Sequence, residues 1–392
     1  MITLNRRASL AGLLAAAAAG PALAKAAPRP TRAPTAWAEA EARAQKMVAD
    51  RLVPGLQVCV RRRGAVVFSK GFGLANIETA TPMSPASVCR IGSITKQFTA
   101  AAILLLAEDG KLSLNDNLAV YMPDFPNAQR LSVRRMLSHT SGLGNYTNNP
   151  NFLQMSRVDR SDAGLMQAMV DASPKLAFEP GTDWQYSNTA YVLLGLLVQK
   201  AAGKPYAQVL QERLFAPHGL THTAVDDAFA VVPNRASGYS DNTRTPGGFQ
   251  NASFIAMSFP GGAGALRSTC EDLCAWHGAL LGGKVLPPEA LKAMLTPATL
   301  NDGSLPKISD RKGGTRTVRY GYGLFLDPVD GRPSVGHDGG IQGFASHLET
   351  EPDDQLTIAT VMNTDGGPLS PPALGPAPGE LAKALRAAAL KL

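Results

Sequence analysis

The sequence predicts an α+β fold, an α/β sandwich in which one antiparallel sheet takes strands from both ends of the chain and a helical lobe is inserted between them. The β-like segments lie near the start and near the end of the chain, at residues 56–60, 65–69, 320–326, 345–350 and 356–362. Residues 115–240 contain mostly helical patterns and long loops. Strands at both ends imply a sheet completed by distant parts of the chain. A cleft between such a sheet and the lobe is where a small ligand is expected to bind.

The first residues have the layout of an export signal. The pair Arg6-Arg7 precedes a short Leu/Ala-rich run, and small residues follow up to Ala24. The arginine pair resembles a twin-arginine signal. The apolar run is shorter than the roughly 20 residues that a membrane-spanning helix needs. We therefore expect residues 1–24, possibly to 26, to be removed, leaving a periplasmic or secreted protein without a stable membrane span.

The remainder is expected to form one composite domain with a tail. No flexible linker interrupts residues 36–365, which we assign to a single hydrolase domain. Residues 366–392 comprise a Pro/Gly-rich stretch and a last amphipathic helix from 380. Of the 392 residues, 45% are hydrophobic, which is enough for a full core.

The charge pattern does not indicate a nucleic-acid-binding protein. The formal net charge is +7, and two of these charges are in the expected signal. The densest basic run, residues 61–63, stands before Gly64 between two β-like segments, as in a solvated hairpin turn. We expect no nucleic-acid partner.

The cysteines show neither metal-ligand nor disulfide spacing. They are Cys59, Cys89, Cys270 and Cys274. The last two stand four apart in a helical stretch, where a bridge is geometrically awkward. We expect all four to act as small buried apolar residues.

The helices are indicated by apolar periodicity and by the residues that end each run. A first helix over 36–51 is broken by Pro54-Gly55, and a strongly apolar helix over 94–108 ends at Asp109-Gly110. A third helix, over 189–202, stops at Gly203. Further helices are expected after Pro205 and over 271–281.

A serine and a lysine stand three residues apart where the helix 94–108 begins. Ser93 and Lys96 share a helix face, so the lysine amine can reach the serine hydroxyl. A serine hydroxyl becomes nucleophilic when a neighbouring base takes its proton. Ser304 and Lys307 repeat the spacing, but Pro306 denies them a helix. The alternative is that Ser93 caps the helix and Lys96 is a surface lysine.

A tyrosine and an asparagine precede the helix 189–202. Beside the ammonium of Lys96, the phenolate of Tyr186 would be favoured, so it could accept the Ser93 proton and return it to the leaving group. Asn188 could hold Lys96 and the substrate carbonyl. Tyr146 and Asn148 have the same spacing in a loop, and Tyr186 is preferred because a helix follows it.

A glycine-rich segment, residues 336–340, enters a late β segment. Its glycines allow a ligand to approach the backbone closely, and His337 could orient the substrate. A backbone N–H from this segment and that of Ser93 could form an oxyanion hole. A tight turn with a surface histidine is the alternative.

The order S-x-x-K, Y-x-N and a basic residue followed by x-G resembles the serine β-lactamase and penicillin-binding-protein superfamily. Within it, the chain is most similar to the class C β-lactamase branch, with D,D-carboxypeptidases, D-aminopeptidases and β-lactamase-like esterases. The resemblance runs from about residue 40 to 363, through the phrases IGSITKQFTA, MLSHTSGL, FEPGTDWQYSN, GGAGALRSTCEDL, YGYGLF and GHDGGIQGF.

The resemblance implies a β-lactamase/transpeptidase-like fold and a role for each site residue. Ser93 would be the acylated nucleophile, Lys96 and Tyr186 the acid/base pair, and Asn188 a substrate ligand. His337 and Gly339 would stand in the third motif, with Gly340 and Ser93 supplying the oxyanion-hole N–H groups. His139, in the phrase SHTSG, reads as a structural turn. No cofactor is implied.

The third motif departs from the pattern of many β-lactamases, which have lysine at its first position. Its second residue is Asp338, a carboxylate that would repel a β-lactam acid or a peptide C-terminus unless it is neutralised. Esters, or substrates with a free amine, fit better.

We therefore expect an exported serine hydrolase that acts on esters, amides or D-amino-acid peptides, including peptidoglycan-like peptides. The alternative is an acylatable penicillin-binding or cell-wall-peptide binding module with little turnover. A metallohydrolase is least favoured, because Pro217 and Gly219 spoil a helix between His218 and His222, and no H-E-x-x-H glutamate accompanies them.

Overall fold

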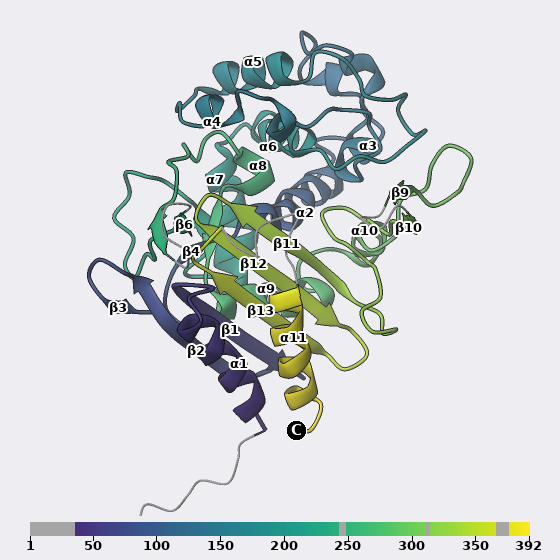
Figure 1. Ribbon diagram of the computed structural model, residues 1–392. Helices are drawn as coiled ribbons and strands as arrows, with labels where there is room; N and C mark the ends of the chain where they lie inside the picture. Colours follow the sequence, from purple (N-terminus) through teal and green to yellow (C-terminus); the bar gives the residue numbers. More distant parts are fainter. Residues whose placement is uncertain (1–35, 243–247, 310–313, 366–375) are drawn as a thin grey trace, which may run out of the picture. The chain divides into compact units, whose positions relative to one another are not determined.

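Six strands form the central sheet, in the order β11-β12-β13-β1-β2-β3, and all neighbours are antiparallel (Figure 1). The computed structural model describes residues 36–242, 248–309, 314–365 and 376–392, with the side chains of the last range from 381. The strands are β1 (Gly55–Arg62), β2 (Ala65–Asn76), β3 (Thr81–Pro82), β11 (Val335–Ile341), β12 (Phe344–Glu351) and β13 (Leu356–Met362).

The two ends of the chain meet in the middle of this sheet. β1 pairs with β13 from Leu56 opposite Met362 to Arg62 opposite Leu356. Every residue of β13 is buried, because helices cover both faces of the sheet there. The sheet is therefore completed by segments some 300 positions apart, as the sequence predicts.

Two terminal helices cover one face of the sheet. α1 (Ala38–Ala49) and α11 (Pro376–Ala389) lie side by side on it (Figure 1). Their apolar residues share a core cluster with β1 and β13 that includes Met47, Val58, Ile358 and Leu385. α9 (Cys270–Leu281) covers the opposite face, where Trp276 stacks on Phe98 of α2 (Thr95–Glu108) at a centroid distance of 4.1 Å.

A helical lobe, drawn above the sheet in Figure 1, is built around α2 and α6 (Asn188–Ala202). Ser187 caps α6 by accepting a hydrogen bond from the N–H of Ala190, and Gly203 ends it. The other helices are α3 (Val133–Leu137), α4 (Phe152–Met155), α5 (Asp162–Ala172), α7 (Tyr206–Leu210), α8 (Gly261–Gly264) and α10 (Pro288–Met294).

Small sheets complete the described fold. β4 (Cys89–Arg90), β8 (Leu266–Ser268) and β5 (Ala224–Val225) form one of them. Two hairpin-like pairs are β6 (Tyr239–Asp241) with β7 (Phe249–Asn251), and β9 (Lys307–Ser309) with β10 (Thr315–Thr317).

The prediction of a strand at residues 320–326 is wrong. This segment makes only isolated bridges, in which Phe325 pairs with Tyr320 and with Gly336, because the chain turns through Gly321 and Gly323. Among the strands whose bounds the sequence pattern did not predict is β11, which contains the glycine-rich motif itself.

All four cysteines are buried free thiols. In the described part of the chain, none of the helices combines the length and the apolar character needed to cross a bilayer. The expected signal peptide and the Pro/Gly-rich stretch 366–375 lie outside the described residues.

The packing of α11 predicts that the C-terminal helix contributes to the stability of the whole domain. Leu385 is 1% exposed against the sheet, so Leu385→Ala is expected to lower the free energy of unfolding by about 2–5 kcal/mol in urea denaturation. Val120→Ala, at a side chain that is 66% exposed, is the control and should change it little. An equally small effect at Leu385 would show that the helix is not part of the core.

Candidate active site

Ser93 lies in a short 3-10 turn, Gly92–Ile94, which stands directly before α2 and against the edge strand β11. Gly92 has a φ of +49°, and a Cβ there would lie 2.8 Å from both the backbone N and O of Gly340. Only glycine allows this close approach. The turn therefore holds Ser93 next to the glycine-rich segment, in which Gly340 is 247 positions further along the sequence.

Lys96 is fully buried and reaches three oxygen atoms. Its Nζ lies 3.1 Å from Ser93 Oγ, 2.7 Å from Asn188 Oδ1 and 2.8 Å from the carbonyl oxygen of Ala263. These partners come from the 3-10 turn, from the first residue of α6 and from α8. The lysine thus joins three remote segments at one atom.

The surroundings of Lys96 favour its neutral form. Burial lowers the pKa of Lys96 well below 10.5, because the charged form loses its hydration. A neutral amine has two N–H groups and one lone pair. The Asn188 and Ala263 oxygens can only accept hydrogen bonds, so they take both N–H groups. The lone pair is then left for the hydroxyl proton of Ser93, which is the arrangement of a general base and a nucleophile.

Tyr186 also contacts Ser93. Its hydroxyl is hydrogen-bonded to Ser93, and its ring centroid lies 4.8 Å from Lys96 Nζ. Burial raises the pKa of Tyr186, and the hydrogen bond to Ser93 only partly offsets that effect. The structure therefore contradicts the phenolate predicted from the sequence: the resting pair is an amine and a phenol. The prediction assumed a charged lysine, whereas burial removes that charge.

Asn188 is held from both sides of its amide. Its Oδ1 accepts from Lys96, and its Nδ2 donates to Asn145 Oδ1 at 3.3 Å. Tyr146, the alternative tyrosine, is buried and packs edge-on against Phe259 at 5.1 Å. The structure thus brings Tyr186, rather than Tyr146, to Ser93.

His337 lies on β11 with its ring 6.0 Å from that of Tyr186. Its Nδ1 is 2.5 Å from the carbonyl oxygen of Asp338, so this nitrogen donates and Nε2 accepts from the Tyr320 hydroxyl at 3.2 Å. Burial is the main cause of the low pKa of His337, about 4, and protonation of the nearby Lys96 also lowers it. At neutral pH the third motif therefore presents a neutral imidazole, whereas the lysine of many β-lactamases would be a cation.

His139 packs against the ring of Tyr186. Its φ of +63° agrees with a turn, but its side chain is buried 4.5 Å from the Tyr186 ring and 4.7 Å from the Tyr320 ring, between centroids. His139 Nδ1 accepts a hydrogen bond from the N–H of Ser187, which caps α6. Burial is the main cause that lowers the pKa of His139 well below 6.5, and protonation of Lys96 or His337 also lowers it. A neutral imidazole therefore supports the Tyr186 ring and the start of α6.

Asp338 is paired with a histidine on the neighbouring strand. His347, directly opposite it in register, places Nδ1 2.6 Å from Asp338 Oδ1 and Nε2 3.5 Å from Glu349 Oε2. Burial opposes the charge on His347, but its bonds to Asp338 and Glu349 outweigh this and raise the pKa of His347 to about 10. Glu349 in turn accepts from Arg386 of α11 at 2.6 Å. The carboxylate of Asp338 is therefore neutralised, and the repulsion of acidic substrates expected from the sequence is relieved.

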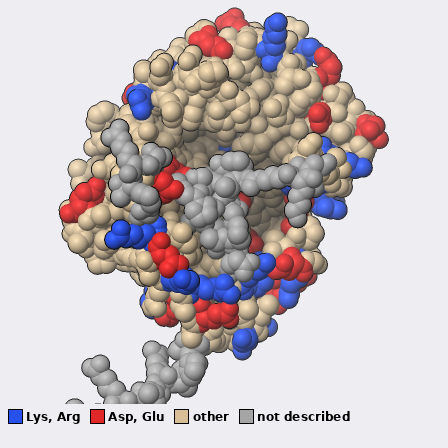
Figure 2. Space-filling model, in the orientation of Figure 1, with Lys and Arg blue, Asp and Glu red and all other residues tan. Residues whose placement is uncertain are grey.

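Charges on the face shown in Figure 2 are interspersed in sign over the described residues, with acidic and basic side chains side by side in its lower part. Within the described ranges there is also no group of three or more His, Cys, Asp or Glu side chains placed to hold a metal ion.

Four further residues have roles in this site that the sequence patterns do not indicate. Asn145 and the Ala263 carbonyl fix the Asn188–Lys96 pair, His139 supports Tyr186, and His347 neutralises Asp338. Ala263 and His139 lie in phrases that carried the resemblance, GGAGALRST and SHTSG, but a backbone carbonyl and a ring contact have no signature in spacing.

Comparisons with known proteins show which family the chain matches. A profile of the Beta-lactamase family matches residues 40–382. Penicillin-binding protein 4* of Bacillus subtilis (strain 168) is 28% identical over 318 residues, 77% of this chain and 66% of that protein. The D-aminopeptidase of Gluconobacter oxydans (strain 621H) is 26% identical over 311 residues, 79% of this chain and 56% of that protein. The chain thus spans less than two thirds of the length of either relative.

Solved structures share the fold. A D-stereospecific amidohydrolase from Streptomyces sp. superimposes with a TM-score of 0.69 at 28% identity, covering 84% of this chain and 94% of that one. The D-amino acid amidase from Ochrobactrum anthropi SV3, in complex with D-phenylalanine, gives a TM-score of 0.73 at 24% identity, covering 90% and 100%. These likenesses confirm the predicted fold class and the resemblance drawn from the motifs.

The Asp338–His347 pair predicts a pH-dependent stability. The pKa of His347 is about 10 in the folded chain and near 6.5 when unfolded, so its contribution is complete below about pH 6.5 and is lost as the pH rises through about 10. In urea denaturation between pH 6 and 10, His347→Gln should be less stable than the wild type at pH 6, and the two should converge towards pH 10.

His218→Gln is the matched control, because burial lowers the pKa of His218 and its charge is not a stabilising one in this range. A difference between wild type and His347→Gln that stays constant from pH 6 to 10 would contradict an ionised pair.

Proposed function

Because the chain belongs to the Beta-lactamase family of serine hydrolases, we propose that it hydrolyses esters or amides, including those of D-amino acids, through an acyl-enzyme on Ser93. The observation that carries this proposal is the 3.1 Å contact between Lys96 Nζ and Ser93 Oγ, with the two remaining bonding positions of the amine taken by carbonyl oxygens.

In the first step, the amine of Lys96 accepts the hydroxyl proton of Ser93 while Oγ bonds to the substrate's carbonyl carbon. The carbonyl oxygen gains the negative charge. We assign its stabilisation to the backbone N–H groups of Ser93 and Gly340, which the Gly92 turn brings together. Asn188, which is bonded to Lys96, and His337, whose ring lies near that of Tyr186, are proposed to orient the substrate.

In the second step, the bond from the carbonyl carbon to the leaving oxygen or nitrogen breaks. The leaving group takes the proton that Lys96 received, and the Tyr186 hydroxyl, hydrogen-bonded to Ser93, is proposed to relay it. A water molecule then attacks the acyl-enzyme with Lys96 again accepting the proton, and release of the acid restores the Ser93 hydroxyl.

The substrate class is supported by the relatives and by the charges of the site. Two of the similar proteins are named as a D-aminopeptidase and a D-stereospecific amidohydrolase. With Asp338 neutralised by His347, and with His337 uncharged, the third motif has no fixed cation for a substrate carboxylate. Short-chain esters and D-amino-acid amides are therefore proposed ahead of β-lactams.

This mechanism predicts that removing the lysine is nearly as damaging as removing the nucleophile. Ser93→Ala should abolish hydrolysis of p-nitrophenyl acetate, and Lys96→Met should lower kcat/KM by about 10²–10⁴ because no base remains. For the wild type, kcat/KM should fall as the pH drops through the lowered pKa of Lys96, since the ammonium cannot accept a proton. D-alanyl amide hydrolysis should respond in the same way.

The chain carries its own matched controls. Ser304 and Lys307 repeat the spacing on an exposed segment, so Ser304→Ala and Lys307→Met should retain wild-type rates. Thermal unfolding of each variant separates a catalytic loss from a folding defect. Wild-type rates in folded Ser93→Ala would refute the mechanism.

The second candidate is an acylatable binding module with little turnover, favoured by the similarity to penicillin-binding proteins. It predicts one stoichiometric burst of p-nitrophenol followed by no steady state. Sustained turnover that scales with enzyme concentration would exclude it.

We also propose that the protein works outside the cytoplasm. The proposal is supported by the Arg6-Arg7 pair and the small residues up to Ala24, which lie outside the described residues. Replacing both arginines by lysine should retain the protein in the cytoplasmic fraction of an expressing bacterium. Unchanged export would contradict a twin-arginine route.

A further inference from the structure

A pocket of about 220 Å³ lies at β4 and β8, beside the turn that joins β11 to β12. Three arginines line it: Arg90 of β4, Arg267 of β8 and Arg235. Arg90 and Arg267 stand directly opposite each other in the pairing of their strands. None of the residues to which the hydrolytic mechanism assigns a role lines this pocket.

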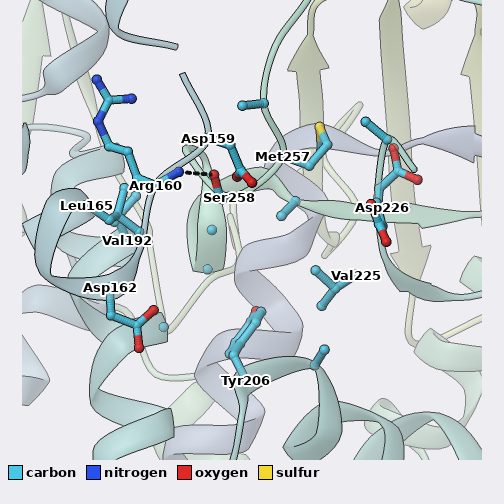
Figure 3. A pocket seen from close by; sticks show the side chains of 18 of the residues that line it. Asp159, Arg160, Asp162, Leu165, Val192, Tyr206, Val225, Asp226, Met257 and Ser258 are labelled. Atoms are coloured by element: carbon cyan, nitrogen blue, oxygen red, sulfur yellow. Dashed lines mark hydrogen bonds between the residues drawn. The ribbon is translucent and has the colours of Figure 1, made fainter. Parts of the chain in front are cut away.

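One buried carboxylate gathers the three guanidiniums. Asp226 lies 2.8 Å from Arg90, 3.0 Å from Arg235 and 3.3 Å from Arg267. It stands between this pocket and a larger cavity of the helical lobe, and Figure 3 looks into that larger cavity with Asp226 at its side. The residues that line the smaller pocket therefore carry three positive charges and one negative charge.

Two carboxylates on neighbouring segments stand outside the lining of the pocket and are bonded to backbone N–H groups. Asp227 Oδ1 accepts from the N–H of Phe229 at 2.8 Å, and Asp365 Oδ2 accepts from the N–H of Gly343 at 2.6 Å. Two of the three arginine charges are thus not balanced by a carboxylate of the pocket itself.

Each guanidinium also keeps N–H groups that accept no partner in the described part of the chain. Arg90 donates only through Nε, so both of its terminal nitrogens are open. Arg267 donates only through Nη1, to Asp226 and to a backbone carbonyl oxygen. Arg235 donates through Nη2, to Asp226 and to carbonyl oxygens of its own loop, while its Nε is buried without a described partner.

The environment of these open N–H groups favours an anion. The side chains of Arg90 and Arg267 are each 18% exposed and that of Arg235 is 30% exposed, so water hydrates their charges only in part. Like charges gathered at one carboxylate repel each other, and a bound anion would offset that repulsion. A guanidinium presents its N–H groups as a planar fork, which matches a carboxylate or a phosphate.

The rest of the lining leaves room for more than a bare ion. The rings of Phe254 and Phe344 and the side chains of Ala236 and Ala252 are apolar. A pocket with an apolar wall and a few convergent polar groups suits a small organic molecule whose polar group fixes its orientation.

We propose that this pocket binds a small molecule through a carboxylate or phosphate group. The open N–H groups of Arg90, Arg235 and Arg267 hold the anionic group, and the apolar body lies against Phe254 and Phe344. The pocket does not include the acylation residues, and the proposal does not depend on the proposed function.

The test compares three probes of one shape that differ in charge at pH 7: benzoate is an anion, benzamide is neutral and benzamidine is a cation. Their Kd values for the purified full chain are measured by isothermal titration calorimetry at constant ionic strength. Benzoate should bind at least about tenfold more tightly than benzamide, a difference of about 1.4 kcal/mol, and benzamidine should bind most weakly. Equal affinities, or a preference for benzamidine, would overturn the proposal.

A fourth probe distinguishes the two anionic groups. Phenyl phosphate is titrated beside benzoate under the same conditions, and the tighter of the two identifies the group that the arginines prefer. Failure of both to bind would overturn the proposal.

A charge variant tests the arginines. Arg90→Gln removes one guanidinium and leaves Asp226 with two arginine partners, so it should weaken benzoate binding at least about tenfold and change benzamide binding little. Arg213→Gln removes an equal charge outside the pocket, where the arginine pairs with Asp109, and is the matched control. A benzoate affinity that Arg90→Gln leaves unchanged would refute the assigned contacts.

A second variant fills the pocket and keeps its charges. Ser253 lines the pocket at an exposed position, so Ser253→Trp should block it and weaken benzoate binding at least about tenfold. Asn251→Trp, at an exposed position outside the lining, should bind as the wild type does. Undiminished binding to Ser253→Trp would place the probe elsewhere, including the catalytic cleft, and refute the site. Thermal unfolding of each variant checks that the fold is intact.

Discussion

The burial of one lysine side chain determines how the site is built. Lys96 has no exposed surface, and an ammonium ion so placed would lose its hydration at a cost of several kcal/mol. Two features reduce this cost. The neutral amine is favoured over the ammonium, and each bonding position of Nζ has an oxygen partner. Those partners exist only if α2, α6 and α8 meet at one point. The position of Lys96 beside Ser93 and the packing of the helical lobe therefore depend on the same contacts.

Glycine makes that meeting possible on both sides of the lobe. Gly195 of α6 and Gly262 of α8 stand so close that a Cβ on Gly195 would lie 2.9 Å from the Gly262 nitrogen. α8 can then present its Ala263 carbonyl to Lys96. On the other side, Gly92 brings Ser93 against β11. Larger residues at these positions would separate the amine from the hydroxyl without touching either of them.

Much of the site could be predicted from the sequence, because helix geometry links spacing to proximity. Ser93 and Lys96 are three residues apart at the start of an apolar helix, and Tyr186 and Asn188 precede another. Protonation states could not be predicted in the same way. The phenolate predicted for Tyr186 required a charged Lys96. The burial that lowers the pKa of Lys96 results from the packing of three helices, which no local sequence pattern reveals. His139 was taken as a turn residue, which its backbone confirms, whereas its ring contact with Tyr186 depends on how α6 packs.

In the sheet, too, one feature could not be predicted from the sequence pattern, and this feature affects substrate specificity. The bounds of β11 could not be predicted because residues 336–340 are rich in glycine. The pairing of β11 with β12 places His347 opposite Asp338. By itself, the carboxylate of Asp338 would repel acidic substrates. Because it is paired with His347 on the neighbouring strand, the two side chains together carry no net charge. That pair continues through Glu349 to Arg386 on α11, the last helix of the chain. The electrostatic character of the third motif is therefore set by His347 on the neighbouring strand, with Glu349 and Arg386 of α11 behind it, and not by the motif residues alone.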